Sequence, residues 1–270
     1  AARRDPEASL AFVASDHHIP DHRAFRAAII EAAESAAQGR IVTLGVTPSG
    51  PSQAYGYIKP SGRGLSAVDS FVEKPDRTQA QTYIDAGYLW NSGNFIVSAA
   101  ALIDELAAHA PAVIDAARSA LPVEGSGAVQ TLGSAFVTSP KISIDYAVME
   151  KTARASVLEV DFAWSDLGAW DSIAASGEGD TGQHIFEDAE GCLVRAPDGI
   201  LVAALGVRNL AIVVEQDAVL VCDLSQSQGV KQVVERIKAT SPRHLDFATP
   251  PPEGLAEGAI RYRMLVARRS

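Results

Sequence analysis

The sequence predicts an α/β protein followed by a small β-rich module. Residues 10–14 and 41–46 are short apolar runs, and the segment between them, 21–38, repeats apolar residues at the helical period. This strand, helix, strand order is typical of a right-handed βαβ unit. The chain has 270 residues and 47% apolar content, enough for one large or two unequal domains.

The first expected strand, 10–14, reads as a buried parallel strand, and it would place Asp16 just beyond its carboxyl end. Asp21 is the expected N-cap of the helix that follows, and Gly39 is the residue expected to end it. Residues 41–46 then form the second strand. Further strands are expected at 55–58, 67–72, 95–97 and 157–162, and helices at 76–84, from Ser98 with a restart at Pro111, and at 143–151.

The composition changes to Gly, Asp and Glu around residues 176–187, which predicts a domain boundary. Beyond it, four apolar runs recur roughly nine residues apart, at 192–194, 200–205, 210–214 and 219–222. This pattern suits either a small all-β module or a few coils of β-helix. We therefore expect an α/β domain over 1–176, a β-module with a closing helix over 184–240, and a linker and tail over 241–270. The loop 122–141 contains Gly125-Ser126-Gly127, but no strand precedes it and no phosphate-loop lysine follows.

Charge and hydropathy exclude several classes of protein. The net charge is −10 and the basic residues are scattered, which argues against a nucleic-acid groove. No apolar run approaches the ~20 residues that span a bilayer, and the N-terminus lacks the plan of a signal peptide. The two cysteines, Cys192 and Cys222, lie in apolar runs, as expected of reduced buried thiols. We expect a cytoplasmic protein.

Two carboxylates, Asp16 and Asp166, are each expected where a strand ends. Ligands of open α/β sheets bind at that edge, so the pair could hold a Mg²⁺ that bridges phosphate oxygens. The alternative is that each aspartate only caps the turn or helix that follows it.

A second polar group lies between residues 71 and 95. Glu73 can accept hydrogen bonds from sugar hydroxyls, Lys74 can pair with a phosphate, and Asn91 can add an amide contact. Asp145 would join them if its helix faces the same edge. The alternatives are a surface salt bridge, ordinary loop chemistry at Asn91 and a helix cap at Asp145. The tryptophans nearby could wall a sugar or simply pack in the core: Trp90, Trp164 and Trp170.

Two other chemistries lack support in the sequence. Asp16-His17-His18 matches the signature of the DHH phosphoesterases, but the further metal-binding motifs of those enzymes are absent. No serine or cysteine has a matching histidine and acid pattern, so covalent catalysis is not indicated.

Six motifs together resemble the mannose-1-phosphate guanylyltransferases in order and spacing, from residue 1 to about 240. They are Ala14-Ser15-Asp16-His17, Tyr55-Gly56-Tyr57-Ile58, Phe71-Val72-Glu73-Lys74-Pro75, Trp90-Asn91-Ser92-Gly93-Asn94-Phe95, residues 143–151 and residues 164–170. The resemblance implies a nucleotide-diphospho-sugar transferase fold, with a Rossmann-like mixed sheet and a small C-terminal β-helix-like module.

The resemblance also implies the reaction of GTP with mannose 1-phosphate to give GDP-mannose and pyrophosphate, with Mg²⁺. By the same resemblance, Asp16 and Asp166 hold the metal and Lys74 is the sugar-phosphate cation. Glu73 and Asn91 bind sugar hydroxyls, while Gly56 makes a backbone contact near the sugar. Such a reaction needs positioning and charge neutralisation but no covalent intermediate.

The chain departs from the family pattern at its start. The family's first strand and its loop of the type Gly-x-Gly-Thr-Arg-Leu-Trp-Pro-Leu-Ser are not in this sequence, so we expect a domain truncated at its N-terminus and poor turnover from these residues alone. Residues 259–263 resemble the start of an isomerase domain, but no metal-binding histidines follow, and isomerase activity is not expected.

Two alternatives to this function stay open. One is a non-catalytic regulatory or scaffold subunit that binds a sugar nucleotide, and the other is a pyrophosphorylase for another sugar 1-phosphate. The apolar C-terminal module is a candidate surface for self-association.

Overall fold

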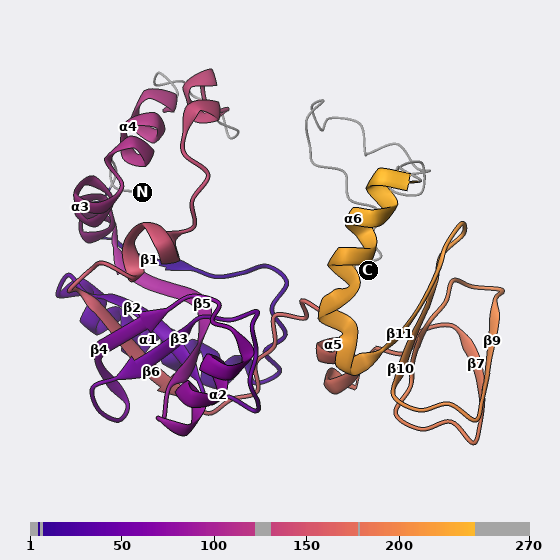
Figure 1. Cartoon of the computed structure of the whole chain (residues 1–270). Coiled ribbons are helices and arrows are strands. Elements are labelled where there is room, and N and C mark those ends of the chain that lie inside the picture. The colour runs from indigo at the N-terminus through magenta and orange to yellow at the C-terminus, as the bar shows by residue number, and fades with distance from the viewer. Residues whose placement is uncertain (1–4, 6–7, 122–130, 178, 241–270) are drawn as a thin grey trace. The chain divides into compact units, whose positions relative to one another are not determined.

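The protein is represented by a computed structural model that describes residues 5, 8–121, 131–177 and 179–240. These residues form two compact units (Figure 1). Unit 1 contains Ile19–Trp164 and the described residues up to Ser15, whereas unit 2 contains Asp16–His18 and the described residues from Ser165 onward. The expected linker and tail, 241–270, and the segment Gly125-Ser126-Gly127 lie outside the described residues.

Unit 1 is built on a six-stranded sheet with the order β1-β5-β2-β6-β4-β3. β2 and β6 are parallel, and the other neighbouring pairs are antiparallel, so the sheet is mixed, as predicted. β3 also pairs with the first residues of β5, which brings these two strands together at one end of the sheet. The strands are β1 (Ser9–Phe12), β2 (Ile41–Val46), β3 (Tyr57–Pro60), β4 (Leu65–Val72), β5 (Leu89–Ser98) and β6 (Ala155–Val160).

The helices of unit 1 begin where their capping residues predict. Asp21, Asp76 and Ser98 each accept a hydrogen bond from a backbone N–H three residues later, which satisfies a donor that the first helical turn leaves unpaired. The helices are α1 (His22–Ala37), α2 (Arg77–Asp85), α3 (Ala99–His109), α4 (Pro111–Ala120), the 3₁₀-helix η1 (Ser134–Thr138) and the π-helix η2 (Asp145–Met149). The helix expected at 143–151 is thus a single π-turn.

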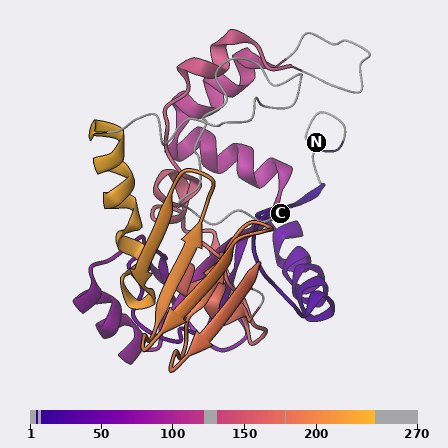
Figure 2. The same cartoon turned by 90° about the vertical axis from the view of Figure 1, so that its right-hand side faces the viewer.

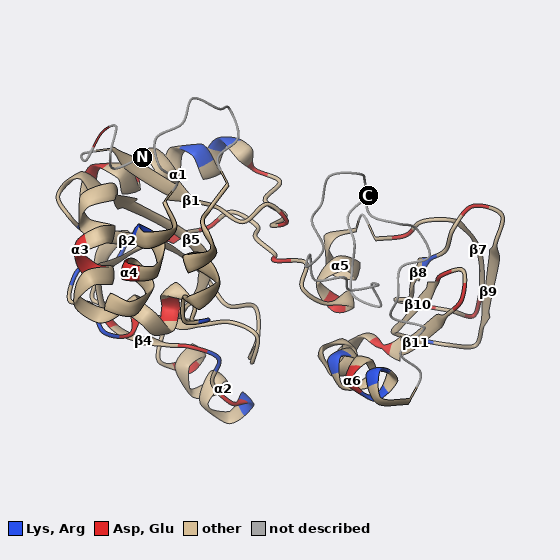
Figure 3. Cartoon of the chain, turned by 90° about the horizontal axis from the view of Figure 1, so that it is seen from above, with Lys and Arg blue, Asp and Glu red and all other residues tan. Residues whose placement is uncertain are grey.

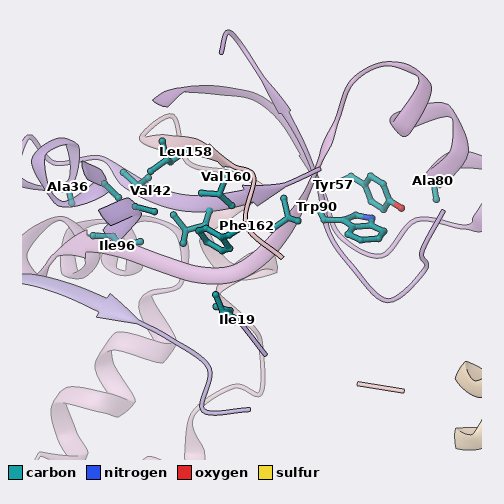
Figure 4. Close-up of a cluster of buried hydrophobic side chains, with 14 residues drawn as sticks. Ile19, Ala36, Val42, Tyr57, Ala80, Trp90, Ile96, Leu158, Val160 and Phe162 are labelled. Atoms are coloured by element: carbon teal, nitrogen blue, oxygen red, sulfur yellow. The ribbon is translucent and has the colours of Figure 1, made fainter. Parts of the chain in front are cut away.

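Hydrophobic cores cover both faces of this sheet. The small residues Ala28, Ala32 and Ala36 let α1 pack closely on β2 and β5, in a cluster that also holds Trp90 and Phe162 (Figure 4). On the other face, α3 and η2 pack on a second cluster that includes Ile41 and Val148. β2 is buried along its whole length because both cores meet on it.

The first strand differs from its prediction. β1 is an edge strand that pairs antiparallel with β5 alone, and most of it is exposed, so the expectation of a buried parallel strand over 10–14 is wrong. β1 and β2 still run in the same direction on either side of β5. An unbroken apolar run does not distinguish a buried strand from an edge strand, because burial depends on what packs against it.

The segment 91–94, expected at a strand end, lies inside β5 instead. Thr43 pairs with Phe95 and Gly45 pairs with Asn91, so β5 carries extra residues at this point and forms a bulge against β2. Gly93 has φ of +71°, a conformation that side chains disfavour. Bulges of this kind redirect side chains next to binding sites.

Unit 2 contains two coils of a β-helix-like arrangement, whose strands are drawn in orange in Figure 2. β7 pairs with β9 and β8 pairs with β10, both in parallel and eighteen positions apart, as in the pairs Gln183 with Leu201 and Leu193 with Ala211. Of the two interpretations of the repeat, the β-helix coils are therefore the correct one. The elements are α5 (Trp170–Ser176), β7 (Gln183–Glu187), β8 (Leu193–Arg195), β9 (Leu201–Leu205), β10 (Leu210–Val214), β11 (Val219–Asp223), the 3₁₀-helix η3 (Leu224–Gly229) and α6 (Val230–Thr240).

The charged residues are spread over many elements. In the view of Figure 3, Lys and Arg lie on separate helices and loops, interspersed with Asp and Glu. Among the described residues, no helix is both long and apolar enough to cross a bilayer. Cys192 and Cys222 are free thiols and are half-buried rather than fully buried.

Candidate functional site

Five of the predicted site residues come together in unit 1. Glu73 and Lys74 directly follow β4, Gly56 directly precedes β3, Asn91 lies in β5, and Asp145 is the first residue of η2. Asn91 donates its side-chain N–H to Asp145 Oδ1 at 3.0 Å and its backbone N–H to the Gly56 carbonyl at 2.8 Å. We call this group the polyol site, after the sugar ligand that the sequence predicts for it.

Glu73 is the most unusual member of the polyol site. Its side chain is only 6% exposed, and its Oε1 pairs with Lys74 Nζ at 2.8 Å. Its Oε2 is buried and has no hydrogen-bond partner among the described residues. Burying a carboxylate oxygen without a hydrogen-bond partner is unfavourable. We therefore expect Glu73 Oε2 to accept a hydrogen bond when a ligand is bound, for example from a ligand hydroxyl.

Gly56 leaves open the space that Glu73 Oε2 faces. A Cβ built on Gly56 would lie 2.5 Å from Glu73 Oε2 and 3.4 Å from Asn91 Cβ. The first distance is shorter than Cβ atoms tolerate, so a side chain at residue 56 would fit only if the Glu73 carboxylate moved. The backbone contact with a sugar that the resemblance implies for Gly56 stays a prediction.

Lys74 is held in a strained conformation. Its φ is +48°, in the left-handed region, and its backbone N–H donates to the Tyr55 carbonyl at 3.2 Å. Left-handed backbone at a residue other than glycine costs of order 1–3 kcal/mol and is concentrated at functional sites. The Lys74 side chain is 55% exposed, so it remains accessible to an anion while it pairs with Glu73.

The pKa values of Glu73 and Lys74 are both raised, but for different reasons. Burial raises the pKa of Glu73, the hydrogen bond from Lys74 opposes that rise, and the charge of Asp145 adds to it. The hydrogen bond to Glu73 raises the pKa of Lys74, since it favours the ammonium. The Glu73 side chain is buried whereas the Lys74 side chain is largely exposed, so desolvation affects the carboxylate more than the ammonium.

The Glu73 pKa leads to a prediction for stability. Where a folded-state pKa is raised, the folded state binds more protons than the unfolded state between the two pKa values, so acidification favours folding. We expect the free energy of unfolding of the wild type, relative to Glu73→Gln, to rise as the pH falls from about 7 toward the unfolded pKa of a glutamate, about 4.3. Urea unfolding at several pH values measures this difference.

The control for that series is Glu31→Gln, which replaces an exposed carboxylate on α1. The opposite result would be a free energy of unfolding of the wild type, relative to Glu73→Gln, that falls as the pH is lowered. It would show that the ion pair with Lys74, and not burial, dominates the pKa of Glu73.

The other two predicted residues, Asp16 and Asp166, lie in unit 2. Two backbone hydrogen bonds join their segments, from His18 N to the Ser165 carbonyl at 2.8 Å and from Ser165 N to the His18 carbonyl at 3.1 Å. This antiparallel bridge sets Asp166 opposite His17. Burial lowers the pKa of His17, and the charges of Asp16 and Asp166 both oppose that change, so the two carboxylates lie near one imidazole.

Asp166 also shapes its own turn. Its Oδ1 accepts the Gly168 N–H at 3.0 Å, as an aspartate in an Asx turn does, and Leu167 between them has φ of +46°. The helix α5 begins at Trp170, beyond this turn. No group of three or more His, Cys, Asp or Glu side chains among the described residues is arranged to hold a metal ion.

Two residues that hydrogen-bond to the polyol site were missed in the sequence. Thr43 on β2 donates its hydroxyl to Asn91 Oδ1 at 2.7 Å, and Glu150, just after η2, accepts the Glu73 backbone N–H at 3.3 Å. The signal for Thr43 was its polarity within the apolar run Ile41–Val46. No local pattern distinguishes Glu150 from a surface acid.

All three tryptophans contribute to core packing, and Trp164 packs half-buried against the unit 1 cluster. Trp90 and Trp170 are buried in the cores of units 1 and 2, respectively. Tyr55, next to Gly56, makes edge contacts with Trp90 and with the half-buried Trp164.

Comparison with known proteins identifies related sequences over most of the chain. Residues 2–181 match the family described as "Nucleotidyl transferase", and residues 182–237 match the "MannoseP isomerase/GMP-like beta-helix domain". A xanthan biosynthesis protein, XanB, of Xanthomonas campestris is 41% identical over 249 residues, which are 88% of this chain and 53% of that protein. The mannose-1-phosphate guanylyltransferase of Escherichia coli K12 is 38% identical over 257 residues, which cover 88% of this chain and 54% of that protein.

A solved structure is similar as well. The crystal structure of a "mannose-1-phosphate geranyltransferase" from Thermus thermophilus superposes with a TM-score of 0.77 at 33% identity, over 88% of this chain and 72% of that one. The chain spans about half the length of the curated relatives it matches. On these matches over most of its length, the chain belongs to the nucleotidyl transferase family.

Proposed function

We propose that the protein transfers a guanylyl group from GTP to mannose 1-phosphate, giving GDP-mannose and pyrophosphate. The observation that carries this proposal is the buried Glu73 Oε2, which has no hydrogen-bond partner among the described residues and faces the space left by Gly56. A carboxylate in that position is suited to a sugar hydroxyl. The names of several relatives support the choice of mannose and of the guanylyl group.

The four polar side chains of the polyol site then each have a role. Glu73 accepts a hydrogen bond from a sugar hydroxyl, and Lys74 pairs with the sugar phosphate. Asn91 makes a second contact with the sugar, and Asp145 holds the Asn91 amide by the 3.0 Å hydrogen bond. These residues fix the sugar phosphate so that its oxygen attacks the α-phosphorus in line with the departing pyrophosphate.

We assign Asp16 and Asp166 to a Mg²⁺ ion. Carboxylate oxygens are the ligands this ion prefers, and it is commonly bound by one or two carboxylates with phosphate and water oxygens completing the shell. The electrostatic effect of both aspartates on His17 supports a shared location. When bound, the ion would offset the negative charge of the phosphates.

The test measures pyrophosphate release by the full-length gene product. We expect the highest kcat/KM with GTP and mannose 1-phosphate, compared with glucose 1-phosphate and with ATP or UTP, and no turnover after chelation of divalent cations. A higher kcat/KM with another sugar phosphate or nucleotide would replace the substrate assignment. Sugar-nucleotide binding without pyrophosphate release would favour the scaffold subunit instead.

The setting of the reaction is part of the proposal. We propose a cytoplasmic protein, where nucleoside triphosphates and reducing conditions occur, in agreement with two free thiols. We also propose self-association through the C-terminal module, whose strands β9 and β11 expose Leu205, Val219 and Val221. Analytical ultracentrifugation measures this state.

A further inference from the structure

Thr43 is a buried polar residue in an otherwise apolar strand. It lies in the middle of β2, where every residue is buried, and it is 0% exposed. Burying a hydroxyl is unfavourable unless it is hydrogen-bonded. The hydroxyl makes its hydrogen bond with the polyol site, since it lies 2.7 Å from Asn91 Oδ1.

The neighbours of Asn91 determine which way its amide points. The Gly93 backbone N–H, 3.2 Å from Oδ1, can only donate, and the Asp145 carboxylate, 3.0 Å from Nδ2, accepts. Each contact separately requires the oxygen to face Gly93 and the nitrogen to face Asp145. The Thr43 hydroxyl must therefore donate to Oδ1.

This arrangement saturates the acceptor oxygen of the Asn91 amide. Oδ1 receives two hydrogen bonds, which match its two lone pairs, whereas Nδ2 donates one N–H and retains a second. The second N–H has no hydrogen-bond partner among the described residues. Asn91 Cβ borders the same space beside Gly56 that Glu73 Oε2 faces.

We propose that Thr43 is a positioning residue that makes Asn91 a hydrogen-bond donor toward the sugar. The proposal rests on the proposed function, because it takes the ligand of the polyol site to be a sugar phosphate. A single hydroxyl can donate to the Glu73 carboxylate and accept from an Asn91 N–H. The site therefore selects a hydroxyl that does both, and a group that only accepts or only donates pairs with one of the two.

The first test uses the ligand-free protein. Thr43→Val keeps the shape of the side chain and removes the hydroxyl, while Thr43→Ser keeps the hydroxyl. We expect the side-chain amide signals of Asn91 in ¹⁵N NMR spectra to shift and its amide protons to exchange faster in Thr43→Val, with wild-type behaviour in Thr43→Ser. Wild-type signals in Thr43→Val would overturn the network, whatever the substrate is.

The second test uses kinetics. We expect Thr43→Val to raise the KM for mannose 1-phosphate about tenfold, as for the loss of one hydrogen bond, with an unchanged KM for GTP and with rescue by Thr43→Ser. Equal changes in both KM values, or failure of rescue, would indicate a structural role only. These kinetics use the full-length gene product. If its wild type showed no turnover, the proposed function would be contradicted, and the NMR result alone would then decide whether the network exists.

Discussion

Gly56→Ala is expected to lower kcat/KM for mannose 1-phosphate by roughly 10²-fold. The added methyl would lie 2.5 Å from Glu73 Oε2, in the space assigned to the sugar. Either the carboxylate moves or the sugar is displaced, and a misplacement of about 1 Å can cost that factor in rate. Steady-state kinetics with each substrate varied in turn measures the loss, which should appear mainly with the sugar phosphate.

The matched control is Gly50→Ala. A Cβ at Gly50 meets no atom within 4 Å, and Gly50 does not have the positive φ that would strain an alanine. We therefore expect wild-type kinetics and an unchanged melting temperature. If Gly56→Ala also retained wild-type kinetics, the space beside Glu73 Oε2 would not be where the sugar binds.

Features of this protein that depend on local chemistry could be predicted from the sequence. A cap such as Asp21 or Asp76 bonds a backbone N–H three residues away, so the signal and the structure lie in the same short segment. β4 ends at Val72, and Pro75 soon after it cannot donate a hydrogen bond in a sheet. Glu73 and Lys74 were accordingly expected at a strand end, and they lie there.

The position of Asn91 could not be predicted in this way. Asn91-Ser92-Gly93-Asn94 has the composition of a turn, but the pairing of β5 with β2 makes it a bulge within a strand. That pairing joins residues about fifty positions apart, as between Thr43 and Phe95. The role of Thr43 depends on the same pairing. The sequence therefore showed a polar residue in an apolar strand but did not identify Asn91 as its hydrogen-bond partner.

The C-terminal module shows a related limit. The spacing of the apolar runs predicted β8 to β11, whereas β7, Gln183–Glu187, is largely polar and was not expected. It forms because β9 pairs with it residue for residue, from Gln183 with Leu201 to Glu187 with Leu205. A strand that is stabilised by backbone pairing rather than by burial leaves little trace in hydropathy.

Asp166→Asn is expected to reduce Mg²⁺-dependent turnover by roughly 10³-fold in the full-length gene product, the scale of several kcal/mol of charge stabilisation. Asparagine retains an oxygen that can accept the Gly168 N–H, so the turn before α5 should be preserved. The loss therefore reports the charge. Titration of the rate with Mg²⁺ should show a higher metal requirement, which a purely structural defect would not produce.

Asp198→Asn is the control for that variant, because Asp198 is an exposed aspartate in a turn of the same unit. It should show the wild-type rate and the wild-type Mg²⁺ requirement. The two roles considered for Asp166 differ most clearly here. If the aspartate only caps its turn, asparagine replaces it well, since asparagine is equally suited to such turns. If it holds the ion, the neutral amide cannot substitute for the carboxylate. Near wild-type turnover by Asp166→Asn would therefore show that Asp166 is only a turn residue and would contradict its assignment as a metal ligand.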